Sequence, residues 1–284
     1  MHGEILDSIN HLADHRRVLE ALFRTFKDTP RVVGLFVSGS TARRSMDRYS
    51  DIDLGVVLDS DGAREKTWKD RWDWQVEPWF HRFDADHIKA HFVIYLFDPC
   101  VKADINLYTL SDLPAWQGAP YDPVMSHTEA IEDWCKRSNA EASEVAARQP
   151  VISNDDLIHD DERVWAWLVY VTQHVLRGEY YSAAASYPDI RYIIERWSAI
   201  LRSESSFDVR KIESRYPAAE VNVLSQLFPA PDPHSLRISF DQTIVAHERQ
   251  RLEITKRFGV DWRTSDHAIT RVKEIVQSIG QIVD

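Results

Sequence analysis

The stretch from Arg31 to Leu58, RVVGLFVSGSTARRSMDRYSDIDLGVVL, constrains the fold more than any other part of this sequence. An apolar run at 32–37 predicts a strand, Gly39-Ser40 predicts a tight turn, and a second apolar run at 52–58 predicts another strand. Asp51 and Asp53 lie at the start of that second strand. Residues two apart in a strand point to the same face, and we therefore expect the two carboxylates to project together.

These residue types indicate a particular chemistry. Two carboxylates offer hard oxygen ligands of the kind that Mg²⁺ prefers, usually together with the phosphates of a substrate. The Gly39-Ser40 turn offers backbone N–H groups and a hydroxyl to a phosphate. The alternative is an ordinary turn followed by aspartates that cap a loop. The strand–turn–strand context favours the metal and phosphate interpretation.

A second pair of apolar runs follows, at 91–97 and 103–110, joined by Asp98-Pro99-Cys100. The pattern predicts a β-hairpin that completes a mixed sheet. Asp104 interrupts the second run, and an acid within a strand is unfavourable unless it has a partner or faces water. An edge-strand Asp in water is the alternative to a functional carboxylate.

The run GSTARRSMDRYSDID resembles the signature of the DNA polymerase β-type nucleotidyltransferase superfamily. Within that superfamily it is most similar to the small enzymes that adenylylate aminoglycoside or lincosamide antibiotics. The resemblance covers about the first hundred residues. It implies an α+β fold, in which an N-terminal nucleotidyltransferase domain with a mixed β-sheet flanked by helices precedes a C-terminal α-helical bundle.

The resemblance also implies roles for individual residues. Gly39, Ser40, Arg43 and Ser50 correspond to the positions that bind the triphosphate of ATP or another nucleoside triphosphate. Asp51 and Asp53 correspond to the acids that hold Mg²⁺. Asp104 corresponds to the third carboxylate, which acts as a metal ligand, as the catalytic base, or as both.

The composition of the chain indicates which partners it binds and where in the cell it is located. The net charge of −11 argues against a nucleic-acid binder and favours a cationic acceptor, although many proteins are acidic for solubility alone. No apolar run reaches the roughly 18 residues of a membrane span, and the N-terminus lacks the pattern of a signal peptide. We expect a cytoplasmic protein, and the sequence does not indicate its oligomeric state.

Three segments are expected along the chain: a nucleotidyltransferase domain at 1–112, a linker at 113–123 that is rich in proline, and a helical acceptor-binding domain at 124–284. One amphipathic helix is predicted over 4–27. Another is predicted at 63–80, with Trp68, Trp72 and Trp79 on one stripe and Trp74 off it. The acidic run 160–162 is predicted to begin a helix, and one of its acids is also a minor candidate for binding the acceptor or acting as the base.

The predicted function is Mg²⁺-dependent transfer of a nucleoside monophosphate, AMP from ATP by resemblance, to a hydroxyl of a small cationic acceptor such as an aminoglycoside or lincosamide, with release of pyrophosphate. Two alternatives use the same fold on a protein partner: a component of a toxin–antitoxin pair, and an enzyme that adenylylates a protein side chain. The length of 284 residues weighs against the toxin–antitoxin alternative.

Overall fold

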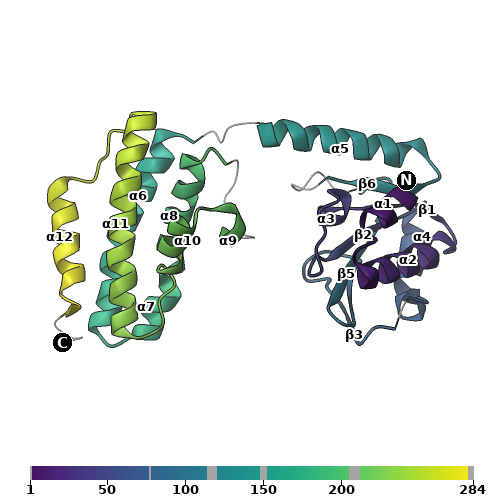
Figure 1. Cartoon of the computed structure of the whole chain (residues 1–284), viewed down its shortest axis with the longest axis horizontal. Coiled ribbons are helices and arrows are strands. Elements are labelled where there is room, and N and C mark those ends of the chain that lie inside the picture. The colour runs from purple at the N-terminus through teal and green to yellow at the C-terminus, as the bar shows by residue number, and fades with distance from the viewer. Residues whose placement is uncertain (1, 77, 114–119, 148–151, 205–211, 281–284) are drawn as a thin grey trace. The chain divides into compact units, whose positions relative to one another are not determined.

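The computed structural model describes residues 2–76, 78–113, 120–147, 152–204 and 212–280. The chain divides into two compact units, Met1–Ala147 and Arg148–Asp284. Figure 1 shows strands together with helices in the first unit, and helices in the described part of the second. This order confirms the predicted α+β class, with a mixed sheet and its flanking helices before a helical unit.

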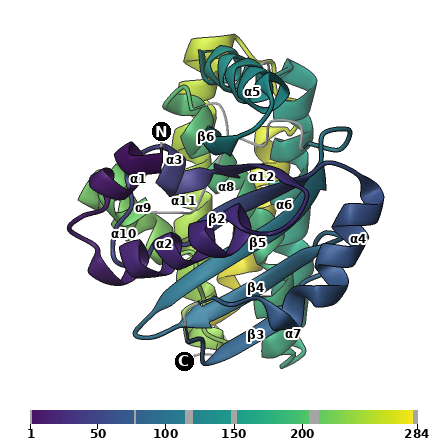
Figure 2. The same ribbon diagram turned by 90° about the vertical axis from the view of Figure 1, so that its right-hand side faces the viewer.

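The first unit is built on a mixed sheet of six strands in the order β3-β4-β5-β2-β1-β6, which can be followed in Figure 2. The strands are β1 (Val32–Val37), β2 (Ile52–Leu58), β3 (His81–Asp84), β4 (Phe92–Phe97), β5 (Val101–Thr109) and β6 (Asp122–Ser126). The β2–β5 pair is parallel, and the other pairs are antiparallel. Both predicted strands around the Gly-Ser turn and the predicted β4–β5 hairpin are confirmed.

One face of the sheet is covered by α1 (His2–Ser8) and α2 (Ala13–Lys27). Apolar side chains of both helices pack with alternate residues of the strands, among them Ile52 and Ile105. The prediction of a single helix over 4–27 is wrong, because the chain turns at Asn10 and His11. Asn competes with helical hydrogen bonding, and the turn lets both helices bury their apolar sides in the same core.

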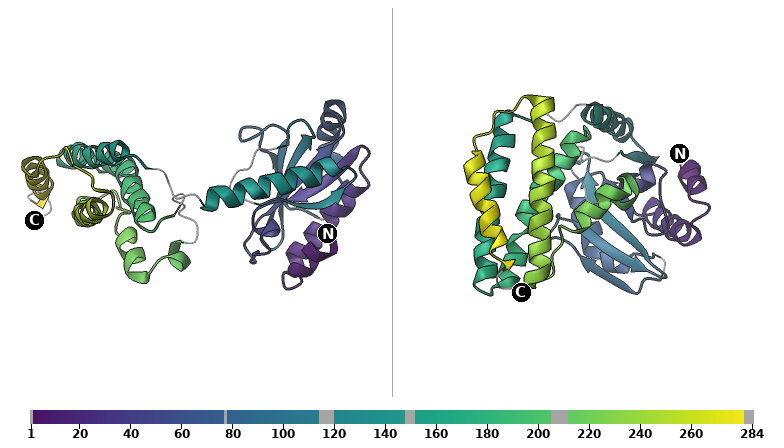
Figure 3. Two further views of the ribbon diagram at one scale, coloured as in Figure 1. Left: turned by 90° about the horizontal axis from the view of Figure 1, so that it is seen from above. Right: turned by 60° about the vertical axis from the view of Figure 1, so that its left-hand side comes forward.

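The other face is partly covered by α5 (Glu129–Ala147), which runs across the sheet in the left view of Figure 3. Trp134 of α5 packs on Phe36 of β1, with ring centroids 4.8 Å apart. Tyr108 of β5 joins the same cluster. Covering only part of this face leaves room for polar side chains on the remaining part of β2 and β5.

The tryptophan-rich segment departs from prediction. Helix α4 (Asp61–Lys69) is shorter than predicted and is followed by a short 3₁₀ turn, η1 (Asp70–Asp73). The predicted stripe of Trp68, Trp72 and Trp79 therefore does not form, and the latter two side chains are 39% and 38% exposed. Trp74, which the sequence places off that stripe, contacts Phe26 edge-on with ring centroids 4.7 Å apart. Helical spacing has no meaning once the helix has ended, and this accounts for the missing stripe.

The domain division lies later than the sequence predicts. Of the predicted linker 113–123, residues 114–119 lie outside the described residues, and 122–123 belong to β6, which pairs with β1. Helix α5 also belongs to the first unit, which ends at Ala147. Pro123 is one of the prolines that led to the linker prediction. It lies in β6, an edge strand, where a proline is tolerated.

The described residues of the second unit form helices joined by turns and loops. Its helices are α6 (Asn154–Leu176), α7 (Tyr180–Ser186), α8 (Pro188–Leu201), α9 (Ile212–Arg215), α10 (Ala218–Ser225), α11 (Pro233–Phe258) and α12 (Asp266–Gln277). The right view of Figure 3 shows α6, α11 and α12 running alongside one another, around a core that includes Leu168, Trp197 and Phe240. Across the described ranges of the chain, no helix is both long and apolar enough to cross a membrane.

Two carboxylates are buried inside this helical core. Helix α6 begins at Asn154, where Ser153 and Asp156 form a capping box, and the prediction that 160–162 begins a helix is therefore wrong. Asp161 is fully buried and accepts hydrogen bonds from His247 Nε2 at 2.9 Å and Trp165 Nε1 at 3.0 Å. Asp160 is buried against Arg196. These contacts stabilise the bundle and leave neither carboxylate open to an acceptor.

The buried His247 leads to a prediction about stability. Burial lowers its pKa, and the Asp161 carboxylate opposes this effect without outweighing it; Arg251 and Glu248 also act on the ring. Below about pH 6.5 the unfolded chain therefore binds a proton that the folded chain does not. Stability must then fall as the pH decreases from 7 toward 5, by at most about 1.4 kcal/mol per pH unit.

The measurement is the free energy of unfolding of the full chain in urea at pH 7, 6 and 5. We expect His247→Asn, which does not titrate, to be less stable at pH 7 but to show a shallower pH dependence than the wild type. His267→Asn removes an exposed histidine of the same unit and serves as the control. An unchanged slope in His247→Asn contradicts the assignment.

Candidate active site

The structure brings two of the predicted carboxylates together on neighbouring strands. In the parallel pair of β2 and β5, Asp53 lies directly opposite Asp104. Side chains of residues in register point to the same face of a sheet, which is here the face away from α1 and α2. Asp51 immediately precedes β2, two positions before Asp53. The parallel pairing therefore gathers three acids from two distant segments.

Gly39 contacts one of these carboxylates directly. It begins the short helix α3 (Gly39–Ala42) with φ +61°, a backbone conformation that favours glycine. A Cβ at this position would lie only 2.4 Å from Asp53 Oδ2. The Ser38 N–H also donates a hydrogen bond to the Asp53 carbonyl, at 3.1 Å. The glycine is required because the turn passes against the carboxylate.

Ser40 and Arg43 lie at the start and just beyond the end of α3. Ser40 is half-buried and Arg43 is exposed. Across the described parts of the chain, neither side chain makes a hydrogen bond or an ion pair. The two polar groups lie on the same segment as Gly39 and are available to an anion.

Ser50 has a different environment from Ser40. Its hydroxyl accepts a hydrogen bond from the Asp47 N–H at 2.9 Å and donates one to the Asp47 carboxylate at 3.2 Å. Its carbonyl is hydrogen-bonded to Nε2 of His15, a buried residue of α2, at 2.9 Å. Ser50 thus holds the turn that leads into Asp51, and its predicted contact with the triphosphate stays a prediction.

Sequence reasoning missed the contribution of His15. A signal was present, because His15 shares a helical stripe with the apolar residues Val18, Leu19 and Leu22. A polar residue on an apolar stripe needs a buried partner, and the Ser50 carbonyl supplies it. The loop before the first aspartate is in this way attached to the helix beneath the sheet.

Lys102 was also missed, and it contacts two of the three acids. Its Nζ lies 2.8 Å from Asp51 Oδ2 and 3.1 Å from Asp104 Oδ2. Burial lowers the pKa of Lys102, but the hydrogen bonds and charges of the two aspartates outweigh this, and the pKa is raised. The signal was the sequence Lys102-Ala103-Asp104, which places both charges on one face of β5.

Asp104 is more enclosed than Asp51, with side chains that are 17% and 34% exposed. Burial raises its pKa, and the Lys102 ammonium only partly offsets this effect. Its Oδ1 atom is buried, and no hydrogen-bond partner for it exists among the described residues. The same holds for Oδ1 of Asn106, two residues further along the same face of β5. Buried acceptors without donors are uncommon and indicate that a ligand or ion completes the site.

These donors suit a hard divalent cation. Asp51, Asp53 and Asp104 are carboxylates, and Asp104 has an unpaired oxygen. In the described ranges, no three His, Cys, Asp or Glu residues are already spaced to hold a metal ion. Lys102 lies between two of the acids, and its ammonium contacts the carboxylate oxygens that a metal ion would otherwise bind.

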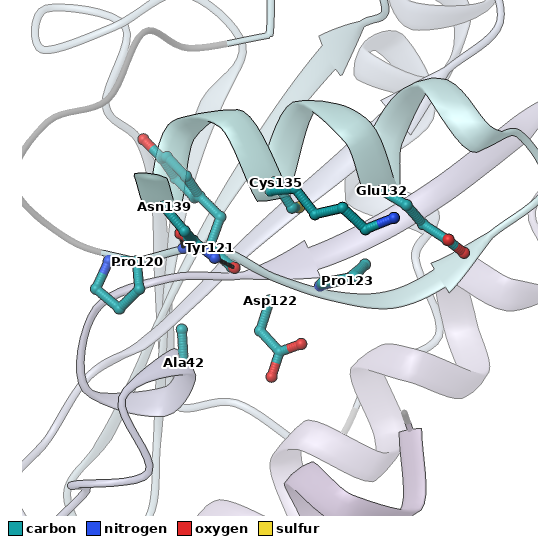
Figure 4. A pocket seen from close by; sticks show the side chains of 9 residues that line it. Ala42, Pro120, Tyr121, Asp122, Pro123, Glu132, Cys135 and Asn139 are labelled. Carbon is teal, nitrogen blue, oxygen red and sulfur yellow. Dashed lines mark hydrogen bonds between the residues drawn. The ribbon is translucent and has the colours of Figure 1, made fainter. Parts of the chain in front are cut away.

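A pocket of about 340 Å³ lies between α3, β6 and α5 (Figure 4). Asp122 and Glu132 contribute carboxylates to it, and Ala42 connects it to the turn that carries Ser40. Arg44, the residue after Arg43, forms an ion pair with Asp122. None of the three site aspartates lines this pocket.

No curated protein matches the chain significantly. Among solved structures, it is similar to an aminoglycoside 6-adenyltransferase from Bacillus subtilis, with 12% identity, a TM-score of 0.42, and coverage of 93% of this chain and 97% of that one. It is also similar to a CD-NTase from Bradyrhizobium diazoefficiens in complex with GTP, with 15% identity, a TM-score of 0.30, and coverage of 98% and 88%. Both TM-scores are below 0.5, and neither likeness supports a statement about the function of this chain.

The family comparison matches one segment of the chain. Residues 16–106 match the family described as nucleotidyltransferase domain. The match includes the Gly39-Ser40 turn and all three site aspartates, and extends from the start of α2 into β5. The predicted enzyme class and the predicted resemblance to nucleotidyltransferases in general are therefore confirmed: residues 16–106 of this chain form a nucleotidyltransferase domain.

Proposed function

We propose that this protein transfers a nucleoside monophosphate, AMP from ATP in the simplest case, to a hydroxyl group of a small cationic acceptor. The acceptor oxygen forms a bond to the α-phosphorus, the bond from that phosphorus to the bridging oxygen breaks, and pyrophosphate leaves. The acceptor class follows from the predicted resemblance to enzymes that modify aminoglycosides or lincosamides.

One observation carries this proposal: Asp53 and Asp104 are in register on parallel strands, beside Asp51, with Gly39 packed against Asp53. The arrangement places acids next to a turn that carries unpaired polar groups. A site for transfer from a triphosphate needs both parts, one for the reacting phosphorus and one for the charge of the leaving group.

Each residue of the site then has its own role. Ser40 and Arg43 bind oxygens of the triphosphate, and Ser50 supports the loop that positions Asp51. Asp104 accepts the proton of the acceptor hydroxyl, a role that a raised pKa favours because it brings the carboxylate closer to the working pH. Asp51, Asp53 and Asp104 would hold a Mg²⁺ ion, and the bound ion would neutralise the charge that develops on phosphate oxygens.

The charge of the protein supports a cationic acceptor. A net charge of −11 creates a negative potential that attracts amines and repels nucleic acids. The helical unit, predicted to select the acceptor, offers no residue that identifies it.

The direct test is incubation with α-labelled ATP, Mg²⁺ and either a panel of aminoglycosides and lincosamides or a cell lysate. We expect label on a small molecule and none with Asp53→Asn. Label on a protein instead supports the alternative of protein adenylylation. Absence of label from both, with GTP, CTP and UTP also tested, contradicts the proposal.

A further prediction concerns the triphosphate contacts. We expect Arg43→Ala to raise the KM for the nucleotide by roughly tenfold, and Ser40→Ala by less, because a charge-assisted hydrogen bond is stronger than a neutral one. Neither should change the ranking of acceptors. Arg48→Ala removes an exposed arginine of the same loop, which stacks on Tyr49, and serves as the control. A changed ranking in Ser40→Ala contradicts the assignment.

A further inference from the structure

The Lys102 ammonium is positioned like a bound cation. It contacts one oxygen of Asp51 and one of Asp104, at 2.8 and 3.1 Å. Its side chain is 35% exposed, whereas that of Asp104 is 17% exposed. The charged end therefore lies in the site while the side chain as a whole stays partly open to solvent, and its flexible four-carbon stem allows the ammonium to turn outward.

The ammonium and a metal ion compete for the same oxygens. Mg²⁺ binds oxygen at about 2.0–2.1 Å and requires near-octahedral geometry. An ammonium about 3 Å from the same oxygen atoms blocks part of that coordination shell, and the two positive charges repel each other. Three carboxylates and one ammonium leave the cluster with a formal charge of −2, enough to attract a divalent cation.

We propose that Lys102 is an internal cation that holds Asp51 and Asp104 in the metal-free protein and leaves them when a divalent cation binds. Lys102 thereby sets the metal concentration at which the site fills. This inference rests on the proposed function, because it takes the three aspartates as metal ligands. It assigns Lys102 as a positioning residue that acts through the carboxylates.

The exchange has a direct thermodynamic consequence. In the wild type, the binding of a metal ion must break two ion pairs, whereas in a variant without the ammonium it breaks none. We expect Lys102→Met to bind Mn²⁺, in the absence of nucleotide, about tenfold more tightly, the size expected for a partly buried ion pair. Lys102→Arg keeps the charge and should stay within about twofold of the wild type.

The experiment is calorimetric titration of the full chain with Mn²⁺ alone, for the wild type and each variant. Lys69→Met, on the exposed end of α4, changes the net charge by the same amount and separates a local effect from a general one. Circular dichroism checks folding, and Lys102→Gln replaces Lys102→Met if the latter does not fold. Tighter binding in the uncharged Lys102 variants and not in Lys69→Met supports the exchange.

Two results overturn the inference, and they differ in what they say about the proposed function. Unchanged or weaker Mn²⁺ binding in Lys102→Met and Lys102→Gln, with binding intact in the wild type, overturns the role of Lys102 alone. An equal gain in Lys102→Arg has the same meaning, because that variant keeps the charge. If no form of the protein binds Mn²⁺, the metal site and the proposed function fail together with the inference.

Discussion

Replacing Asp53 by Asn is expected to lower nucleotidyl transfer by on the order of 10²-fold or more while leaving the fold intact, the loss typical when a group that stabilises transition-state charge is removed. The carboxamide keeps the shape of the side chain but loses its charge. The Asp53 backbone contacts to Ser38 and to β5 do not depend on that charge. Steady-state kinetics with saturating Mg²⁺ and matching circular dichroism spectra provide the measurement.

The effect of Asp53→Asn needs a control for charge. Asp59→Asn removes a carboxylate just beyond the other end of β2, where Asp59 pairs with Arg31 at the surface. We expect that variant to retain nearly full activity. Asp51→Asn should behave like Asp53→Asn, although it also releases one contact of Lys102. Near-wild-type turnover of Asp53→Asn with Mg²⁺ would falsify the metal assignment.

A loss of similar size is expected for Asp104→Asn, since the Asp104 side chain is only 17% exposed and is in register with Asp53. If Asp104 acts mainly as the base, the chemical step should slow while the affinity for Mg²⁺–nucleotide stays nearly unchanged. The acidic limb of the pH–rate profile, which reports protonation of the base, should then disappear. The raised pKa of Asp104 moves that limb toward neutral pH.

The same variant gives a different result if Asp104 acts mainly as a metal ligand. It should then need much more Mg²⁺ and bind the nucleotide weakly, while the pH dependence persists. Calorimetry with Mg²⁺–nucleotide and a pH–rate profile on this one protein separate the two roles. An active variant with both properties unchanged removes Asp104 from the site and leaves it as an ordinary strand residue.

The sequence predicted the centre of the first unit well because the signals there are local and strong. Strands β1 and β2 lie where the apolar runs 32–37 and 52–58 placed them, and the β4–β5 hairpin was anticipated. Strands β3 and β6 were missed, because both are short edge strands with mixed polarity. An edge strand is specified by the neighbour it pairs with, and a linear pattern carries little information about that pairing.

The candidate site shows the same contrast. Asp51, Asp53 and Asp104 could be named because carboxylates at strand starts or within strands are conspicuous. Lys102 and His15 could not be assigned, because their roles depend on distances between segments that are far apart in the chain: Lys102 reaches Asp51, and His15 reaches Ser50. In the helical unit, Asp161 was predicted to lie at a helix start, because its buried partner His247 is 86 residues away in the sequence.

The parallel pairing of β2 with β5 has a consequence for how this protein acquires its site during synthesis. Parallel strands need a long crossover, and here the crossover contains α4, β3 and β4. The acids of β2 stay apart from Asp104 until the whole of this crossover has emerged and closed onto the sheet. Contacts of such separation in sequence form slowly. The appearance of nucleotidyl-transfer activity during synthesis in a translation reaction should therefore mark the time at which the sheet closes.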